Sequence, residues 1–354
     1  MVIPGGMRGA AARIAMVAVL AAAGGTGAGG TVVQANPLAG DLLTGFNVIT
    51  HGNFATSSDS EGPILVGGTL SGSGTIGNSG LPLPASLTGF GSINVVGTTS
   101  GASYNANGLT VDVNTPVGSP PANFSGASAV HYSYAFPTPF GSMWSTVTAM
   151  SSALAALATT SSGASTSSLT GGNFNAVPVT VDGVAHVAVL DTTAAALEAL
   201  SNPALNLNGA QFFIVNVNTA GTGGNYTQTT NLNFQSFTSE VLWNFYNATS
   251  LSIGTEIGGS VVAPLATVTN TSPIEGALFA NGFLGSGEVH DRPLDSTAIA
   301  LVNAATAAPI PEPASLLILG TALLGLGRIK VFCFFFAKKK ALLFEKRSKN
   351  FLSV

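Results

Sequence analysis

The stretch Leu109-Thr110-Val111-Asp112-Val113 carries the pattern on which the fold depends. Its apolar side chains fall at every second position, with Thr110 and Asp112 between them, and a glycine precedes and an asparagine follows the stretch. Alternation with a period of two, bounded by turn-forming residues, predicts a β-strand.

Short apolar or alternating runs recur from residue 36 to about residue 300, separated by Gly, Ser, Asn and Pro. They lie at Phe46–Ile49, Ile64–Val66, Ile93–Val96, Val184–Leu190, Phe212–Val217, Val241–Phe245 and Val261–Val262. Many short strands with this turn chemistry predict a mainly β body, built as a sandwich, a barrel or a solenoid.

One segment departs from this pattern and predicts a helix. Between Thr138 and Leu157, apolar residues are spaced by three or four positions, which places them on one helical face. Thr138 can cap this helix, and Pro139 suits its first position. We expect the helix to cover the sheet, and we expect a second, shorter helix within Asp191–Leu200.

The charges of the chain are few and unevenly distributed. Charged residues make up 7% of the 354, and between Asn36 and Pro309 a single Arg292 faces 13 Asp and Glu, for a formal charge of −12. A body with one cation cannot neutralise a phosphate backbone, so the sequence predicts no nucleic-acid partner. The body has no Lys for a Schiff base, and Cys333 alone cannot form a disulfide framework or a Cys-based metal cluster.

The N-terminus has the organisation of a secretory signal. Arg8 and Arg13 precede the ten-residue apolar run Ile14–Ala23, which is too short to span a bilayer. Small residues follow, and we place the signal cleavage after Ala35. The alternatives are an uncleaved anchor or a start at Met7.

The C-terminus combines a proline motif, an apolar segment and a basic cluster. Pro311-Glu312-Pro313 precedes Ala314–Gly327, and Arg328 and Lys330 follow. The prolines keep the preceding segment extended, and the basic residues stay on the cytoplasmic side. This arrangement resembles the PEP-CTERM sorting signal. The resemblance implies a substrate site for an exosortase, anchoring in the inner membrane by the C-terminal helix, and delivery of the body to the cell surface or the extracellular space.

The length of the membrane segment allows two interpretations. Ala314–Gly327 covers about 21 Å, short of the ~30 Å hydrocarbon core. Apolar residues resume at Val331–Ala337, and a second membrane stop follows at Lys338, Lys339 and Lys340. A span to residue 337 would bury Arg328 and Lys330, at about 2.5–3.5 kcal/mol each. We therefore expect the short helix followed by a basic tail, and an ordinary tail anchor is the alternative for the whole feature.

The body carries two groups of motifs that match a known family. Near its start these are Asn47-Val48-Ile49, Gly52-Asn53-Phe54, Ser58 to Gly62 and Val66-Gly67-Gly68. Towards its end they are Leu242 to Thr249, Gly259 to Ala266, Ile274 to Ala277 and Glu288 to His290. These motifs resemble the choice-of-anchor A domain over Leu38–Leu294, although Leu265 stands where the family usually has Asn.

This second resemblance implies a right-handed β-solenoid-like body with one helix packed alongside, an adhesive role, and no catalytic residues to carry over. The family joins one domain to varied surface anchors, which agrees with the sorting signal. We divide the chain into a signal peptide (1–35), the β-rich domain (36–300), a linker (301–313), the membrane helix (314–327) and the basic tail (328–354).

Two acidic groups in the body are candidates for binding or chemistry. Asp59 and Glu61 share one face of an extended segment and form either a structural turn or part of a Ca²⁺ site. In Glu288-Val289-His290-Asp291-Arg292 we expect an ion pair that closes the last coil, with Asp291 or Glu288 bound to Arg292, and acid–base catalysis is the alternative. Metal binding by histidines would require distant residues to converge, so we predict no metal and no cofactor. The histidines are His51, His131, His186 and His290.

Two further patterns have structural explanations. Gly72 to Gly77 matches G-x-G-x-x-G, but Gly80 and two prolines follow where a helix would have to begin, so we interpret the motif as a glycine-rich turn. Asn216 and Asn218 flank Val217 in a predicted strand. We expect their amides to cover a solvent-facing surface, with glycan or water binding as the alternative.

Together these patterns predict a non-enzymatic adhesive protein of the extracellular matrix or a biofilm, with extracellular polysaccharide as the candidate ligand. One rival is a glycan-active enzyme that uses Asp59, Glu61 and Glu288. The other rival is a binding module for Ca²⁺ or glycan.

Overall fold

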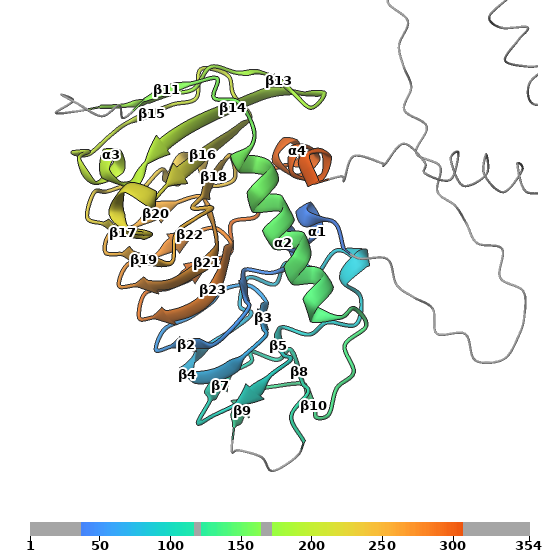
Figure 1. The fold of residues 1–354 in the computed structure, drawn as a ribbon. Coiled ribbons are helices and arrows are strands. Elements are labelled where there is room, and N and C mark those ends of the chain that lie inside the picture. The colour runs from blue at the N-terminus through green and yellow to red at the C-terminus, as the bar shows by residue number, and fades with distance from the viewer. Residues whose placement is uncertain (1–36, 117–121, 164–171, 307–354) are drawn as a thin grey trace, which may run out of the picture. The chain divides into compact units, whose positions relative to one another are not determined.

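Short strands follow one another along the chain, and most of them pair in parallel with a strand from a neighbouring turn of the chain. The computed structural model describes residues 37–116, 122–163 and 172–306 (Figure 1). In these residues the protein is mainly β, as predicted, and a strand occurs in each of the runs that the sequence singles out.

One long sheet faces the helices, and we call it the helix-side sheet. Its strand pairs are all parallel except β13–β14. In spatial order the strands are β10 (Ala129–His131), β8 (Thr110–Val113), β5 (Ile93–Val95), β3 (Ile64–Val66), β1 (Val48–Thr50), the first half of β23 (Leu278–Gly285), the first half of β21 (Ser260–Asn270), β18 (Val241–Asn244), β16 (Phe212–Asn218), β14 (Val184–Thr193) and β13 (Val179–Val181).

A second sheet, built from the same coils, lies on the side away from α2 (Phe140–Ala155), as Figure 1 shows. Its pairs are all parallel. Its strands are β9 (Asn123–Ser125), β7 (Ser103–Asn105), β4 (Thr69–Thr75), β2 (Phe54–Thr56), the second halves of β23 and β21, β19 (Ser250–Ile253) and β17 (Asn225–Gln228), with β6 (Thr98–Thr99) beside the start of β4.

Two small sheets and three short 3₁₀ turns complete the strand-rich part. One sheet contains β20 (Ile257–Gly258), β22 (Ile274–Glu275) and β24 (Val289–His290), all parallel. The other contains β11 (Ser162–Gly163), β12 (Phe174–Asn175) and β15 (Leu205–Asn206), with β11 antiparallel to β12. The 3₁₀ turns are η1 (Ala85–Leu87), η2 (Ala220–Thr222) and η3 (Gln235–Phe237).

The strand order brings together segments from opposite ends of the described chain. β1 lies between β3 and β23, so Val48 pairs with Ile64 on one side and with Leu278 on the other. β2 likewise lies between β4 and β23. The N-terminal coils therefore extend the stack in one direction from β1, and the C-terminal coils extend it in the other.

The apolar core forms two layers, one between the two sheets and one between the helix-side sheet and the helices. β16 contributes to both, because Phe213 and Val215 point into the first layer while Phe212 and Ile214 point into the second. A strand buried on both faces shows a continuous apolar run rather than alternation, which is the pattern of Phe212–Val217.

Three helices cover the helix-side sheet, rather than the one that was expected. They are α1 (Ala39–Gly45), α2 and α4 (Ser296–Thr306). α2 buries Val147, Met150 and Leu154 of the predicted face, together with Met143, while Phe140 and Trp144 are half-buried and Leu157 follows the end of the helix. α1 and α4 were not predicted from the sequence, and α4 continues beyond residue 300, where we ended the body.

Two helix predictions are corrected in detail. The cap position of α2 is Pro139, and the Thr138 side chain turns into the core, where it is fully buried and makes no capping hydrogen bond. The second helix, α3 (Ala194–Glu198), is shorter than predicted, because Asp191 to Thr193 continue strand β14.

The glycine-rich motif is a strand and not a turn, because Gly72 and Gly74 lie within β4. Gly72 has φ +94°, and a Cβ there would approach the Thr56 carbonyl oxygen to 2.2 Å. The close stacking of neighbouring coils therefore requires glycine at this position.

Candidate functional site

The outer surface of the second sheet is free of ionisable side chains. Its strand segments alternate between inward residues, such as Phe54, Tyr226 and Val268, and outward residues that are small or polar, apart from the exposed Leu284. No residue is charged in β9, β7, β4, β2, β19, β17 or the second halves of β21 and β23. We call this surface the uncharged face.

Outward side chains of the uncharged face are aligned across neighbouring strands. One row, in register from strand to strand, consists of Thr227, Ser252, Thr269, Leu284, Ala55 and Ser71. A second row consists of Asn225, Ser250, Thr267 and Gly282. Because paired strands are about 4.8 Å apart, three consecutive hydroxyl groups in the first row and two in the second recur at that interval, on β17, β19 and β21. The array suits contact with an extended neutral surface.

Carboxylates approach the uncharged face only at its edges, where backbone groups engage them. Asp59 Oδ1 accepts a hydrogen bond from Thr75 N at 2.7 Å, and Glu198 Oε1 accepts one from Thr227 N at 3.2 Å. Sequence analysis did not find this face. The hydroxyl–apolar alternation of Ser250–Ile253 and Thr267–Asn270 is the signal that could have revealed it.

A polar cluster lies on the third side of the coils, where β22, β24 and the segment around Ser60 run side by side. Its members carry four carboxylates, one guanidinium and one imidazole: Glu61, Glu275, Glu288, Asp291, Arg292 and His290. His290 Nδ1 is 2.5 Å from Glu275 Oε1, and His290 Nε2 is 2.7 Å from Glu288 Oε2. The cluster joins coils from both ends of the described chain.

The expected partners of Arg292 are wrong. Arg292 Nη1 lies 2.9 Å from Glu61 Oε2, and its Nε lies 3.5 Å from Glu275 Oε2. The parallel stacking brings these two carboxylates from neighbouring coils to the guanidinium. Asp291 instead accepts a hydrogen bond from Ser79 Oγ at 2.7 Å, and Glu288 is engaged by His290.

Two members of the cluster have shifted pKa values. Burial alone would lower the pKa of His290, but its hydrogen bonds to Glu288 and Glu275 outweigh this effect and raise it. Burial raises the pKa of Asp291, against the lowering effect of the hydrogen bond from Ser79. The two shifts therefore have different causes, hydrogen bonds to carboxylates for His290 and burial for Asp291.

The residues that the sequence offers as alternative metal ligands have separate structural partners. Asp59 and Glu61, the candidate Ca²⁺ pair, bind Thr75 N and Arg292 respectively. His131 Nδ1 pairs with the buried Asp112 at 2.7 Å, and His51 stacks on Trp144 with ring centroids 5.0 Å apart. Within residues 37–116, 122–163 and 172–306, no group of three or more His, Cys, Asp or Glu has the geometry to hold a metal ion.

The two asparagines of β16 do not share a solvent face, which corrects the prediction for Asn216. Asn216 lies under α2, where its Nδ2 donates to Leu154 O at 2.8 Å and to Asp191 Oδ1 at 3.0 Å. Asn244 on the next strand donates to Asn216 Oδ1 and Ser151 O, and accepts from Ser151 Oγ. These amides attach the helix to the sheet. Asn218 is half-buried and accepts from Asn247 Nδ2.

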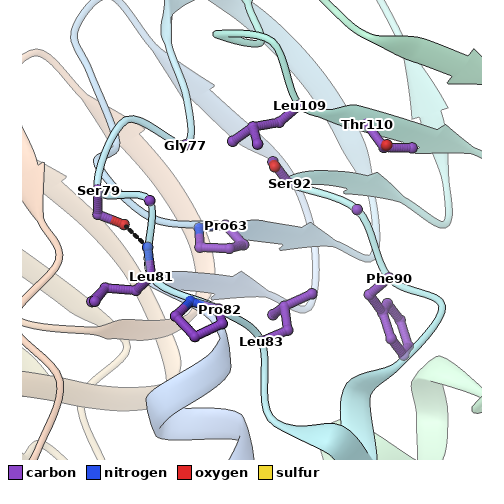
Figure 2. A pocket seen from close by; sticks show the side chains of 12 residues that line it. Pro63, Gly77, Ser79, Leu81, Pro82, Leu83, Phe90, Ser92, Leu109 and Thr110 are labelled. Atoms are coloured by element: carbon purple, nitrogen blue, oxygen red, sulfur yellow. Dashed lines mark hydrogen bonds between the residues drawn. The ribbon is translucent and has the colours of Figure 1, made fainter.

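A pocket of about 350 Å³ opens beside the N-terminal coils, as Figure 2 shows. Leucine, proline and phenylalanine side chains line part of it, together with the hydroxyls of Ser79, Ser92 and Thr110. Asp291 reaches this region only through its hydrogen bond from Ser79. No side chain in the lining is charged.

Comparison with protein families gives one match, to the family described as "Putative Ice-binding-like adhesive domain", over residues 39–291. The chain belongs to this family. Comparisons with curated proteins and with solved structures give no match. The ice-binding-like adhesive domain thus includes β1 to β24, the uncharged face, the pocket and most of the polar cluster, while Arg292 and α4 follow it.

The predicted terminal motifs flank the ice-binding-like adhesive domain and lie outside the described residues. They are the cleavage site after Ala35, the sorting motif Pro311, Glu312 and Pro313, and the membrane stops Arg328, Lys330, Lys338, Lys339 and Lys340. Among the helices of residues 37–306 that are described, none has the length and apolar character to cross a membrane.

Proposed function

We propose that this protein is an exported adhesive protein that is held at the cell surface and binds extracellular polysaccharide through the uncharged face. The proposal rests on one observation: the uncharged face lacks charged residues, although the body has a formal charge of −12. A neutral polymer can bind there without the desolvation of an ionised group. Its hydroxyls can exchange hydrogen bonds with the Ser, Thr and Asn side chains.

For the architecture we propose a right-handed β-solenoid. Each coil gives one strand to the helix-side sheet and one to the second sheet, and the pairs between these coils are parallel and in register. Such a stack supports adhesion, because it repeats the same outward position from coil to coil and so builds a wide contact surface from small side chains.

For delivery we propose the route that the terminal motifs imply. A signal peptide ends at Ala35, an exosortase recognises Pro311-Glu312-Pro313, and the apolar segment after it holds the chain in the inner membrane until processing. The body then belongs to the extracellular matrix or a biofilm, as a choice-of-anchor A protein would. The match to an adhesive-domain family supports the extracellular or surface location in this proposal.

Adhesion is favoured over catalysis by the engagement of the candidate acids. Asp59 binds a backbone N–H, Glu61 binds Arg292, and Glu288 binds His290. The enzyme hypothesis predicts release of reducing sugar from exopolysaccharide, abolished by Glu288→Gln. The Ca²⁺-module hypothesis predicts a higher melting temperature in millimolar Ca²⁺.

The adhesion proposal is tested by placing charge on the uncharged face. Ser252→Lys and Leu284→Lys introduce outward charges in the same row, and Ser145→Lys on the exposed side of α2 is the matched control. We expect the full-length double variant to lose most of its binding to immobilised exopolysaccharide from the producing cells, while the control retains it. Equal binding by all three proteins would refute the face as the contact surface.

The sorting proposal has a separate test. Intact mass and fractionation of the wild-type protein from its native host are compared with those of Glu312→Ala. We expect the wild type to lose the C-terminal helix and the variant to stay membrane-bound at full length. Retention of the tail by both would mean that the motif is a linker.

A further inference from the structure

We infer that the pocket beside the N-terminal coils binds a single neutral sugar ring. The pocket is separate from the uncharged face, because its lining comes from Pro63, from the loops at residues 77–83 and 90–92, and from Leu109 and Thr110 at the start of β8. The inference rests on the proposed function only for the source of the sugar, which would be a unit of the polysaccharide chain.

The first support is a pair of hydroxyl groups that line the pocket. Ser92 is 7% exposed, and its Oγ makes no hydrogen bond in the part of the chain that the structure describes. Thr110 Oγ1, on the neighbouring strand, is likewise without a partner among the described residues. Figure 2 shows both hydroxyls at the same side of the pocket. Two hydroxyls that line one pocket and have no partner among the described residues can exchange hydrogen bonds with the hydroxyl groups of a ligand.

The second support is the composition of the other walls. Leu81, Leu109 and Phe90 line the pocket with apolar surface, and Leu81 is 44% exposed although it is large and apolar. A pyranose ring has one apolar C–H face and a rim of hydroxyls, so it can contact both kinds of wall together. A volume of about 350 Å³ is at the small end of ligand pockets, which suits one ring rather than a long chain.

The third support is charge. The lining contains no ionised group, so neither an acidic nor a basic sugar would find a counter-charge in it. Ser79 Oγ donates to Asp291 at 2.7 Å and accepts from Leu81 N at 3.5 Å, so one lone pair of its oxygen remains to accept from a ligand hydroxyl. The carboxylate behind Ser79 would repel a uronic acid. The ligand class is therefore a neutral hexose or N-acetylhexosamine.

The test is binding of free monosaccharides to the full chain, measured by saturation-transfer NMR titration. The probes are glucose, galactose, mannose and N-acetylglucosamine, with glucuronic acid and glucosamine as charged counterparts. We expect at least one neutral sugar to bind more tightly than its charged counterparts. Ser92→Ala and Thr110→Val should each weaken that binding about five- to tenfold, the effect of one lost hydrogen bond. Ser145→Ala, a serine on α2 far from the pocket lining, should leave it unchanged.

Hydrogen exchange on the wild-type chain keeps the test independent of variant folding. We expect the bound sugar to slow exchange at residues 77–83 and 90–92. No binding of any neutral sugar, protection only elsewhere, preference for a charged sugar, or unaltered affinity in the Ser92 and Thr110 variants would each overturn the inference. Because Ser252→Lys with Leu284→Lys leaves the pocket intact, loss of adhesion without loss of monosaccharide binding separates the two proposals.

Discussion

His290 illustrates at the residue scale how the acidic composition affects stability. Its imidazole lies between Glu275 and Glu288, and this pair raises its pKa above the ordinary value near 6.5. A group whose pKa is raised by folding contributes stability that is fully present below its unfolded pKa. That contribution is lost as the pH rises through the folded pKa. Protonated His290 therefore supports the cluster in mildly acidic conditions.

We predict that the melting temperature of the protein falls as the pH is raised above about 6.5. His290→Asn should reduce this fall, because no titrating imidazole remains between the two carboxylates. The exposed His186 is the control, and His186→Asn should keep the wild-type pH dependence. Asp291 also makes the protein less stable as the pH rises, but at lower pH. Its pKa is raised in the folded protein, so its ionisation costs stability. A pH profile unchanged by His290→Asn would contradict the prediction.

Thr138 gives a second prediction at the residue scale. Its side chain is fully buried at the start of α2, and its hydroxyl has no hydrogen-bond partner among the described residues. Thr138→Val replaces the hydroxyl by a methyl group of similar size, so it should stabilise the protein by up to about 1 kcal/mol. The measurement is urea unfolding, with Thr148→Val, a partly exposed position on α2, as the control. Destabilisation by Thr138→Val would mean that the hydroxyl has a partner.

At the scale of elements, α2 is attached to the sheet by polar contacts within an apolar interface. Asn216 and Asn244 lie on adjacent strands and bind the backbone of α2 at Leu154 and Ser151. The same interface contains Val147 and Met150. The amides satisfy polar groups that would otherwise be buried without partners, so they set the position of the helix along the strands.

We predict that Asn244→Ala lowers the free energy of unfolding by about 2–3 kcal/mol, because Ser151 Oγ loses its acceptor and the Asn216 amide oxygen loses its donor. Asn206→Ala, which removes one exposed amide contact, should change it by less than about 0.5 kcal/mol. Chemical denaturation measures both. Combining Ser151→Ala with Asn244→Ala should cost less than the sum of the single changes. Strict additivity would show that the two side chains act independently.

The elements that could be predicted from the sequence are those whose signal is local. The alternation in Leu109–Val113 predicted a strand, and β8 lies there. The three- and four-residue spacing between Phe140 and Leu154 predicted a helix, and α2 lies there. The site features depend instead on which coils become neighbours. Arg292 meets Glu61, 231 residues away, and Asn216 is buried because a helix happens to cover its strand. No local periodicity contains this information. The partners of Arg292 and the solvent exposure of Asn216 were therefore predicted incorrectly.

At the scale of the whole described body, the first strand is inserted between strands from both halves of the chain. Val48 of β1 pairs with Leu278 of β23, and Phe54 of β2 pairs with Phe283 of the same strand. Pairings so distant in sequence close long loops, which slows folding. The stack is continuous only when the C-terminal coils have formed.

Asn47 links these two halves through its side chain, which is 1% exposed. Its Nδ2 donates to Gly276 O at 3.2 Å and to His290 O at 3.0 Å. Its Oδ1 accepts from Ser60 Oγ at 2.8 Å and from Gly62 N at 3.1 Å. One buried amide thus satisfies groups in both the N-terminal and the C-terminal coils, just before β1 enters the sheet.

We therefore predict that Asn47→Ala is among the most destabilising single changes in the body, at about 3–5 kcal/mol, since it leaves several buried polar groups without partners. Hydrogen exchange should show the loss of protection concentrated in β1, β2 and β23, where the halves meet. Asn114→Ala, which removes one exposed amide contact to Val96 O, should leave that protection intact. If β1 and β23 stayed protected in Asn47→Ala, the junction would depend on the strand pairing and the apolar layers alone. The polar contacts around Asn47 would then have no part in joining the two halves.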